Sequence, residues 1–285
     1  MLPSSISKIF LDGKNFYVKR DDLLYPNLAG NKFRKLYSLL NTPESQYNTI
    51  ISYGGTQSNA MLAIAFLCKM KGWNFLYYTK TLSRAVKEQR FGNFYESQQL
   101  GMRHEELENE YYREFVATLR CDLDERTFLL DQGGANELAQ EGVKVLAEEI
   151  ESSSLKNKSL AIPSGTGTTA LFLALALPEY KVYTVACIGD TEYLKMQMKA
   201  LHTLPKNLEF LELEKKYHFA KPYEELFSLY KKLLHSGIEF DLLYAPLMWK
   251  AILSYGLEDI LYIHSGGVSG NSSMLQRYKN KGYTL

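Results

Sequence analysis

The chain has 285 residues, of which 46% are hydrophobic and 23% are charged, so it can bury a sizeable core and has the composition of a globular protein. Its 33 basic and 32 acidic side chains leave a formal charge of +1, which excludes binding of nucleic acid or of an acidic membrane surface through bulk charge. The longest apolar runs, 60–68 and 170–177, are too short for a membrane helix.

Short runs rich in β-branched and aromatic residues alternate with stretches of helical length. This alternation is typical of βαβ units and predicts an α/β fold built on a parallel sheet. The charged stretch 105–114 is expected to be solvated surface, and the Ser-rich stretch 151–159 marks the clearest shift in composition. In chain order we expect a helix over 32–40, a strand over 48–53, a helix over 58–71, a strand over 73–79, a helix over 87–100, a strand over 127–132, a helix over 136–151, a strand over 159–164, a helix over 168–177, and strands over 182–189 and 261–267.

The turn at residues 164–169, SGTGTT, joins an expected strand to an expected helix. Its glycines let backbone amides approach an anion, its hydroxyls add donors, and a helix N-terminus favours negative charge, so the turn indicates a phosphate site. A plain turn with threonine caps would also give this pattern. The same loop reads as GxGxxA with Asp190 twenty residues after Ala170, which leaves a dinucleotide fingerprint as a competing interpretation.

A second turn, SYGGTQSN over 52–59, places Gln57, Ser58 and Asn59 at the expected start of a helix. Their amides and hydroxyl could converge on a carboxylate or a ring oxygen, although Ser58 or Asn59 could also simply cap the helix.

A third turn, GNKFRK over 30–35, puts Lys32 at the start of a helix, where the helix dipole disfavours a cation. Arg34 and Lys35 add positive charge nearby, and neighbouring cations favour the neutral amine that attacks a carbonyl to form a Schiff base. A basic, solvated helix face is the alternative. A fourth turn, HSGG over 264–267, ends a C-terminal strand.

The composition also bears on location and metals. Three widely spaced cysteines without a CxxC pair indicate neither a disulfide framework nor a structural zinc site, and the five histidines lack metal-ligand spacing. The N-terminus lacks the basic head and apolar stretch of an export signal. We therefore expect a soluble cytoplasmic protein with no metal, no membrane partner and no nucleic-acid partner.

Eight segments follow one another in a fixed order: VKRDDL (18–23), AGNKFRKL (29–36), SYGGTQSNA (52–60), QRFGNFYESQQLG (89–101), QGGANELAQEG (132–142), PSGTGTTA (163–170), LLYAPLM (242–248) and YIHSGG (262–267). In this order they resemble the pyridoxal-phosphate enzymes of the tryptophan-synthase-β-like fold, specifically the 1-aminocyclopropane-1-carboxylate deaminase and D-cysteine desulfhydrase family. The resemblance spans nearly the whole chain, and the combination of GNKxRK with GGxQSN is its most specific part.

The resemblance implies roles for particular residues. Lys32 would hold pyridoxal 5'-phosphate as a Schiff base, Asn59 would contact the hydroxyl of the cofactor ring, and Tyr244 would shape the site and act in acid or base work. Ser58 would handle the substrate carboxylate or a proton transfer, and Gln57 and Asn59 would help to bind substrate. The phosphate loop would consist of Ser164, Gly165, Thr166, Gly167, Thr168 and Thr169, which favours a single phosphate over a dinucleotide.

Two positions depart from the family pattern. Phe219 matches the first of two active-site tyrosines, although Tyr217 or Tyr223 could stand in for it. Ala245 matches a glutamate that faces the pyridine nitrogen in the deaminases. Because these departures remove a proton carrier and a counter-charge, we favour D-cysteine-like β-elimination over opening of a cyclopropane ring. The alternatives are a catalytically eroded cofactor-binding protein and, less favoured, a nicotinamide-dependent enzyme using Gly165, Gly167 and Ala170.

The resemblance also implies an architecture of PLP fold type II, with two lobes of open, twisted, mostly parallel sheets that carry helices on both faces. Residues 1–35 together with 141–285 would form a large cofactor-binding domain, and residues 36–140 a small α/β domain. The implied partners are a small amino-acid substrate and a second copy of the chain in a homodimer.

Overall fold

The computed structural model describes residues 3–25, 28, 30–121, 123–155 and 159–285. Ala29, the first residue of the AGNKFRKL segment, and part of the Ser-rich stretch, 156–158, lie outside these ranges. All statements below concern the described residues.

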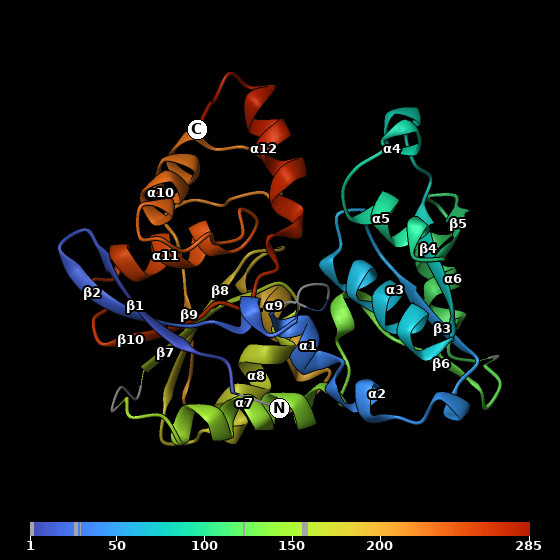
Figure 1. Ribbon diagram of the computed structural model, residues 1–285, viewed down its shortest axis with the longest axis horizontal. Coiled ribbons are helices and arrows are strands. Elements are labelled where there is room, and N and C mark those ends of the chain that lie inside the picture. The colour runs from blue at the N-terminus through green and yellow to red at the C-terminus, as the bar shows by residue number, and fades with distance from the viewer. Residues whose placement is uncertain (1–2, 26–27, 29, 122, 156–158) are drawn as a thin grey trace.

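The strands form two separate sheets (Figure 1). The larger sheet has six strands, in the order β1 (Ile6–Leu11), β2 (Lys14–Lys19), β10 (Ile260–Ile263), β7 (Ser159–Ser164), β8 (Lys181–Ala186) and β9 (Leu208–Leu211). The smaller has four, in the order β5 (Arg103–Leu107), β4 (Asn74–Lys80), β3 (Thr49–Tyr53) and β6 (Thr127–Leu129). Every pairing is parallel except the β1–β2 hairpin. The predicted α/β class with mostly parallel sheets is therefore confirmed.

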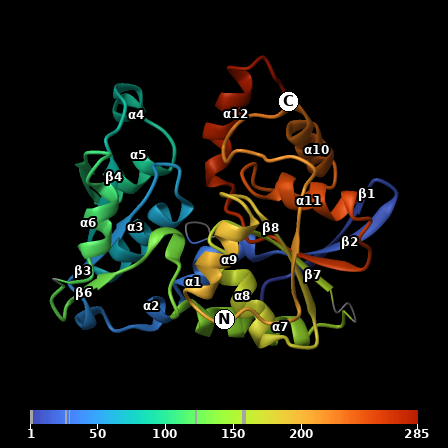
Figure 2. The same ribbon diagram turned by 180° about the vertical axis from the view of Figure 1, so that it is seen from behind.

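Helices cover both faces of each sheet, as expected (Figure 2). Their bounds are α1 (Asn31–Lys35), α2 (Tyr37–Asn41), α3 (Asn59–Lys71), α4 (Arg84–Glu88), α5 (Asn93–Gln99), α6 (Tyr112–Thr118), α7 (Ala139–Glu151), α8 (Thr168–Ala176), α9 (Thr191–Lys199), α10 (Glu224–Leu234), α11 (Ala245–Ser254) and α12 (Asn271–Lys279).

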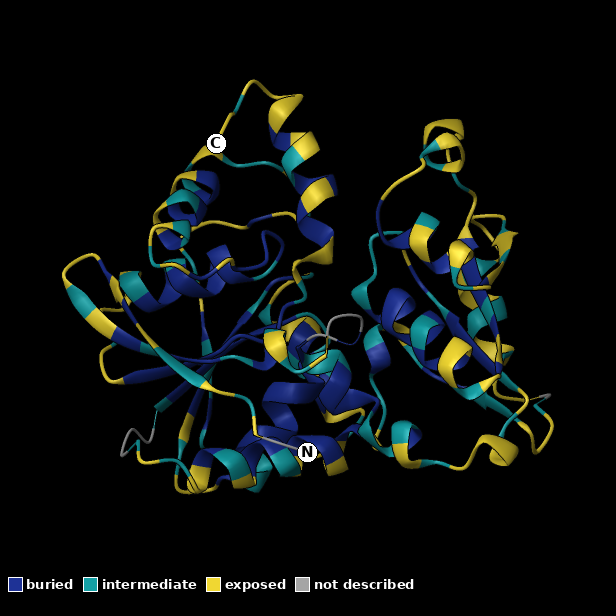
Figure 3. Ribbon diagram, in the orientation of Figure 1, coloured by how far each residue is buried: buried dark blue, intermediate teal, exposed yellow. Residues whose placement is uncertain are grey.

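Alternating side chains of the central strands supply a separate core on each face of the large sheet. On β7, Leu160 and Ile162 pack with α7 and α8, whereas Ala161 packs with α10 and α11. Strand residues alternate between faces, so a strand that is covered on both sides reads as a continuous apolar run. Figure 3 shows the resulting buried centre of the large lobe. This explains why 159–164 is recognisable as a strand from sequence.

Two expectations about local structure were wrong. The expected helix over 87–100 is split into α4 and α5 by Gly92, whose φ of 84° is left-handed. The expected helix over 32–40 is split at Leu36 into α1 and α2. The stretch 105–114 is solvated surface, as expected: its first three residues complete the edge strand β5, which pairs with β4, and most of its residues are exposed. An edge strand is solvated, which agrees with its charged sequence.

Helix α1 is fixed in place by buried ion pairs on one side. The Arg34 guanidinium donates to both carboxylate oxygens of Asp21, at 3.0 and 2.9 Å, and to both of Glu149, at 2.8 and 2.9 Å. Lys19 Nζ donates to Glu149 Oε2 at 2.6 Å. Burial opposes ionisation of Glu149, but hydrogen bonds from Arg34 and Lys19 outweigh it and lower the pKa of that carboxyl.

Helix α7 approaches α1 so closely that one position can only be glycine. A Cβ atom added to Gly142 would lie 2.0 Å from the carbonyl oxygen of Arg34 and 2.5 Å from Tyr37 Cβ. Both neighbours are rigid parts of the helical segment 31–41. Gly142 therefore sets the distance between α7 and α1.

The described residues include no helix that is both long and apolar enough to cross a lipid bilayer. The strands of the smaller sheet all fall within 49–129, whereas those of the larger sheet come from 6–19 and 159–263. The division of the chain into domains at residues 35 and 140 stays a prediction.

Candidate functional site

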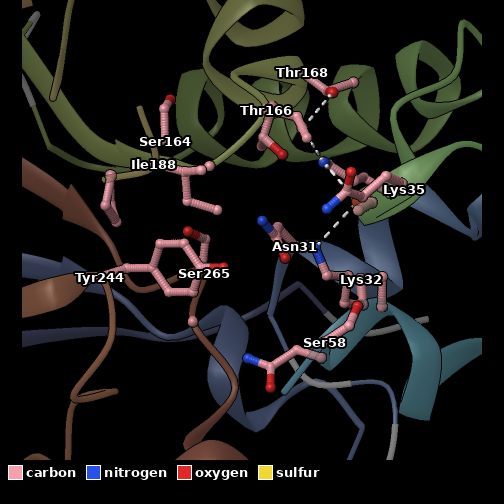
Figure 4. Close-up of a pocket in the computed structure, with 18 of the residues that line it drawn as sticks. Asn31, Lys32, Lys35, Ser58, Ser164, Thr166, Thr168, Ile188, Tyr244 and Ser265 are labelled. Atoms are coloured by element: carbon pink, nitrogen blue, oxygen red, sulfur yellow. Dashed lines mark hydrogen bonds between the residues drawn. The ribbon is translucent and has the colours of Figure 1, made fainter. Parts of the chain in front are cut away.

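A cavity of about 270 Å³ lies where strands of both sheets end. Its walls include the residues that follow β3, β6, β7, β8 and β10, together with one face of α1 (Figure 4). In parallel α/β sheets, ligands bind at the carboxyl ends of the strands. The lining residues are Asn31, Lys32, Lys35, Gly55, Gln57, Ser58, Asn59, Ala60, Gln132, Gly133, Pro163, Ser164, Gly165, Thr166, Gly167, Thr168, Thr169, Ile188, Phe219, Tyr244, Ser265 and Gly266.

The structure brings every predicted site residue to this one cavity. Lys32 comes from α1, and Tyr244 precedes α11. Gln57 and Ser58 lie in the loop after β3, and Asn59 is the first residue of α3. The six residues 164–169 run from the last residue of β7 into the first turn of α8. Their roles stay predictions, but they share one enclosed space although they are up to 212 residues apart in sequence, from Lys32 to Tyr244.

Lys32 presents its amine to the cavity without a carboxylate partner. Its Nζ donates to the carbonyl oxygen of Gly133 at 3.2 Å, and no ion pair of the described residues includes it. Burial lowers the pKa of Lys32 to about 8. About a tenth of the amine is therefore neutral, and so nucleophilic, at pH 7, far more than for a lysine at the ordinary value of 10.5.

Lys35 lines the cavity but was left out of the site predicted from sequence. Its Nζ donates to Gly133 O at 3.0 Å and to Thr166 Oγ1 at 3.2 Å. Burial, and then the charge of Lys32, lower the pKa of Lys35 well below its usual range. Lys35 stands three residues after Lys32, a spacing that places both on the same face of a helix, and this signal could have identified it.

The loop after β7 has the form of an anion site. Gly167, at a φ of 77°, precedes α8, and no side chain caps that helix N-terminus. Thr166 and Thr168 hydroxyls lie 3.0 Å apart, and the buried Thr169 Oγ1 has no hydrogen-bond partner in the described protein. A buried hydroxyl without a partner is costly. Two lysines without carboxylates, a free helix N-terminus and an orphan hydroxyl together fit a phosphate group.

The loop after β3 combines the two predicted roles, capping and lining the cavity. Ser58 Oγ caps α3 by accepting from the Met61 amide at 3.2 Å, and Ser58 also faces the cavity. Gln57 and Asn59 connect this loop to the other lobe: Ser273 Oγ on α12 donates to Gln57 Oε1 at 2.5 Å, and Asn59 Nδ2 donates to Gly267 O at 3.3 Å.

Tyr244 and Phe219 form an aromatic wall, with ring centroids 5.4 Å apart. Burial raises the pKa of Tyr244, so its phenol stays protonated and can donate a hydrogen bond. Asp241 Oδ1 accepts from the amides of Leu243 and Tyr244 at 3.1 and 2.6 Å and thereby fixes the turn before α11. Ala245 is fully buried and is absent from the described lining of the cavity.

Asp190, the acidic residue of the competing dinucleotide interpretation, lies elsewhere. Its Oδ1 accepts from the Tyr193 amide at 2.9 Å and caps α9. Asp190 lines a separate depression of about 260 Å³, which shares none of its described lining residues with the cavity at Lys32. The geometry gives no support to a ribose-binding acid beside the Gly165–Gly167 loop.

No family model matches the chain. Among curated proteins, it is 25% identical over 285 residues to a Thermotoga maritima protein named "Putative 1-aminocyclopropane-1-carboxylate deaminase", with 90% of each chain covered. It is 24% identical to a mitochondrial bifunctional D-cysteine desulfhydrase/1-aminocyclopropane-1-carboxylate deaminase of Arabidopsis thaliana, over 91% of this chain and 74% of that protein.

Solved structures give the same picture of the fold. A crystal structure of an ACC deaminase homologue matches with a TM-score of 0.77 and 22% identity, over 97% of this chain and 94% of the other. A hydrogen sulfide-producing enzyme from Fusobacterium nucleatum matches with a TM-score of 0.67 and 15% identity, over 94% and 96%. The resemblance and the fold predicted from sequence are confirmed, and so is the expectation of an enzyme that depends on pyridoxal phosphate.

Proposed function

We propose that this relative of the 1-aminocyclopropane-1-carboxylate deaminases and D-cysteine desulfhydrases is a lyase that uses pyridoxal 5'-phosphate, bound through Lys32, to act on a small amino acid. The favoured reaction is β-elimination from D-cysteine or a similar substrate, which yields a keto acid, ammonia and sulfide. One observation carries the proposal: the half-buried Lys32 and the buried Lys35, both without carboxylate partners, face a phosphate-type loop in one cavity.

The residues divide the binding between them. Lys35 and the hydroxyls of Thr166, Thr168 and Thr169 would hold the phosphate at the N-terminus of α8. Lys32 would supply the covalent attachment. When bound, the cofactor supplies an electron sink for negative charge at the substrate α-carbon.

The remaining residues would carry the substrate and its protons. Gln57 and Ser58 at the start of α3 would bind the substrate carboxylate, which a helix N-terminus favours. Once the substrate amino group has displaced Lys32 from its covalent attachment, the freed Lys32 amine, whose pKa burial lowers to about 8, would remove the α-proton as general base. Tyr244, protonated because burial raises its pKa, has an O–H to donate to a leaving group.

The aromatic wall supports elimination over ring opening. Phe219, which by resemblance matches the first family tyrosine, packs beside Tyr244, and a phenyl ring carries no proton. Position 245 holds a buried alanine that supplies no counter-charge to the cavity. A cyclopropane substrate has no α-proton to remove, so opening its ring depends more heavily on a second hydroxyl and a counter-charge. β-Elimination instead begins with removal of the α-proton by the Lys32 amine.

The test begins with cofactor binding. Purified protein mixed with pyridoxal phosphate should turn yellow, and borohydride should abolish the visible band. Lys32→Ala should show no band, whereas Lys144→Ala, at an exposed position on α7, should match the unsubstituted protein. A colourless protein that ignores added cofactor would contradict the proposal.

Products then identify the reaction. D-cysteine should release sulfide, keto acid and ammonia, L-cysteine serves as the chirality control, and 1-aminocyclopropane-1-carboxylate should give little or no product. Racemisation without sulfide release would replace elimination as the reaction, since both begin with loss of the α-proton.

A second candidate is a cofactor-binding protein without turnover, which Phe219 and Ala245 favour because both lack groups that could move or balance a proton. A yellow protein that releases no product from a broad panel of D- and L-amino acids would establish this candidate and contradict the lyase.

The family resemblance further supports a homodimer, and the widely spaced, unpaired cysteines suit a reducing cytoplasm. Light scattering should give twice the chain mass of 32.7 kDa. A monomer with full lyase activity would refute the dimer without affecting the assignment of the reaction.

A further inference from the structure

Asn93 is a buried polar residue in the segment 89–101, to which the proposed function gives no role. It is the first residue of α5 and is only 1% exposed. Gly92, whose φ lies in the left-handed region, changes the direction of the chain just before Asn93. This turn brings the N-terminus of α5 against the loop after β3. The break that separates α4 from α5 thus places the Asn93 amide beside the cavity residue Asn59.

Hydrogen bonds fix the orientation of both amides. Asn93 Nδ2 donates to the backbone carbonyl of Gln57 at 3.3 Å and to Asn59 Oδ1 at 2.7 Å. A carbonyl oxygen only accepts, so Asn93 must present its NH₂ group to Gln57, and Asn59 must present its oxygen to Asn93. At the far end, Asn59 Nδ2 donates to the carbonyl of Gly267, which is consistent with the same orientation.

This arrangement leaves Asn59 with one N–H to offer to the cavity. Its oxygen is occupied by Asn93, one amide hydrogen is occupied by Gly267, and Asn59 lines the cavity wall. Asn93 Oδ1, by contrast, is buried with no partner in the described protein. The Asn93 side chain is buried, yet only its NH₂ group makes hydrogen bonds within the described residues. This indicates that Asn93 serves to position the groups that accept those bonds.

We infer that Asn93 is a positioning residue that locks Asn59 as a hydrogen-bond donor toward a ligand acceptor atom, the deprotonated ring oxygen of the bound cofactor. This inference rests on the proposed function. Charged groups also face Asn59: Lys32, Asp22 and Glu96 share a second cavity with it. The test must therefore separate orientation from charge.

The readout is the pH titration of the visible absorbance of the lysine-linked cofactor. Donation from Asn59 to the ring oxygen competes with the proton shared between that oxygen and the lysine nitrogen, so it lowers the pH at which the proton leaves. In Asn93→Ala the Asn59 amide is free to turn, and the titration midpoint should rise by about one pH unit, which corresponds to about 1.4 kcal/mol. Asn93→Asp should raise it at least as far, because a carboxylate cannot donate to Asn59.

Controls separate orientation from other causes. Asn74→Asp, an exposed asparagine on β4 of the same lobe, should titrate like the unsubstituted protein. Asn59→Ala should raise the midpoint by itself, and Asn93→Ala added to Asn59→Ala should shift it no further, because the two residues act through one bond. A shift that persists undiminished in the Asn59→Ala background would overturn the inference, as would an Asn93→Ala midpoint equal to that of the unsubstituted protein.

A measurement on the unsubstituted protein covers the case in which the variants do not fold. The Asn93 side-chain amide, held by two acceptors, should exchange its hydrogens much more slowly than that of exposed Asn74, and equal rates would overturn the inference. If the unsubstituted protein shows no visible band with pyridoxal phosphate, the proposed function fails. If the band is present but does not respond to Asn93→Ala, only the role of Asn93 fails.

Discussion

On one face of helix α1, Arg34 donates four hydrogen bonds to the carboxylates of Asp21 and Glu149. On the other face, Lys32 and Lys35 contact only carbonyl and hydroxyl oxygens. The two faces belong to the same five-residue helix and are both withdrawn from solvent, yet only one provides its cations with counter-charges.

This difference distinguishes a face of α1 that stabilises the fold from a face that is available to a ligand. A buried ionised group is stable when it is paired with an opposite charge. Without such a partner, its pKa shifts so that the neutral form is favoured. Burial shifts the pKa of both lysines downward, whereas Glu149 beside Arg34 keeps its charge. The unpaired face is therefore the one that an anionic ligand completes.

Breaking the paired face should have the largest effect. Arg34→Met leaves the buried Asp21 carboxylate without its cationic partner, with only the hydrogen bond from Ser4 Oγ remaining among the described residues, and should lower the free energy of unfolding by about 3–5 kcal/mol. Urea unfolding measures it. Arg84→Met, which breaks the exposed Arg84–Glu88 pair, is the control and should cost less than about 1 kcal/mol. Equal losses in the two variants would show that burial of the Arg34 network adds no stability.

Removing a cation from the unpaired face should not lower the free energy of unfolding, but it should weaken ligand binding. Lys35→Met should leave the ligand-free protein at least as stable, because a desolvated charge disappears. It should weaken binding of pyridoxal phosphate and of inorganic phosphate tenfold to a hundredfold, the range expected for loss of about 1.5–3 kcal/mol. Calorimetry with both probes checks this, and unchanged phosphate affinity would place the anion elsewhere.

The lowered pKa of Lys32 makes stability depend on pH. Between its folded pKa of about 8 and its ordinary value of 10.5, the unfolded chain binds more protons at Lys32 than the native protein does. Stability of the ligand-free protein should therefore rise with pH across this window, by up to about 1.4 kcal/mol per pH unit from this group. Lys32→Met should lose that rise, as seen in denaturation curves at pH 8 and pH 10. Parallel pH profiles for the two proteins would mean that the pKa is not shifted.

The smallest effect concerns the orphan hydroxyl. Thr169→Val keeps the shape of the side chain and removes a buried group without a partner, so the ligand-free protein should change by less than about 1 kcal/mol. Affinity for pyridoxal phosphate should fall about fivefold. A variant with undiminished affinity would exclude this hydroxyl from the phosphate site.

The central strands could be predicted from sequence because burial on both faces makes them continuous apolar runs. The β1–β2 hairpin was not predicted, although its Asp12-Gly13 turn, with φ of 45° and 83°, is a common hairpin signal. The break at Gly92 could not be predicted from helical periodicity, because the contact of Asn93 with Asn59 that requires it is tertiary.

Residues of the candidate site could be predicted where motif chemistry is local, as in the 164–169 loop. Lys35 was visible in the sequence only as one of several basic residues, because its separation from Arg34 depends on which helix face meets Asp21. Ser273 gave no signal, and Gly267 appeared only as the end of the HSGG turn, since the two reach Gln57 and Asn59 only when the lobes come together.

The close packing at Gly142 has a consequence for tolerance to mutation. Any side chain at this position would meet the Arg34 carbonyl and push α1 aside, carrying Lys32 and Lys35 out of register with the 164–169 loop. A Gly142→Ala protein would keep every cavity residue and lose the cavity. When sequences of this kind are screened for function, an intact set of cavity residues is therefore an insufficient criterion, and a glycine in the middle of α7 belongs in the signature.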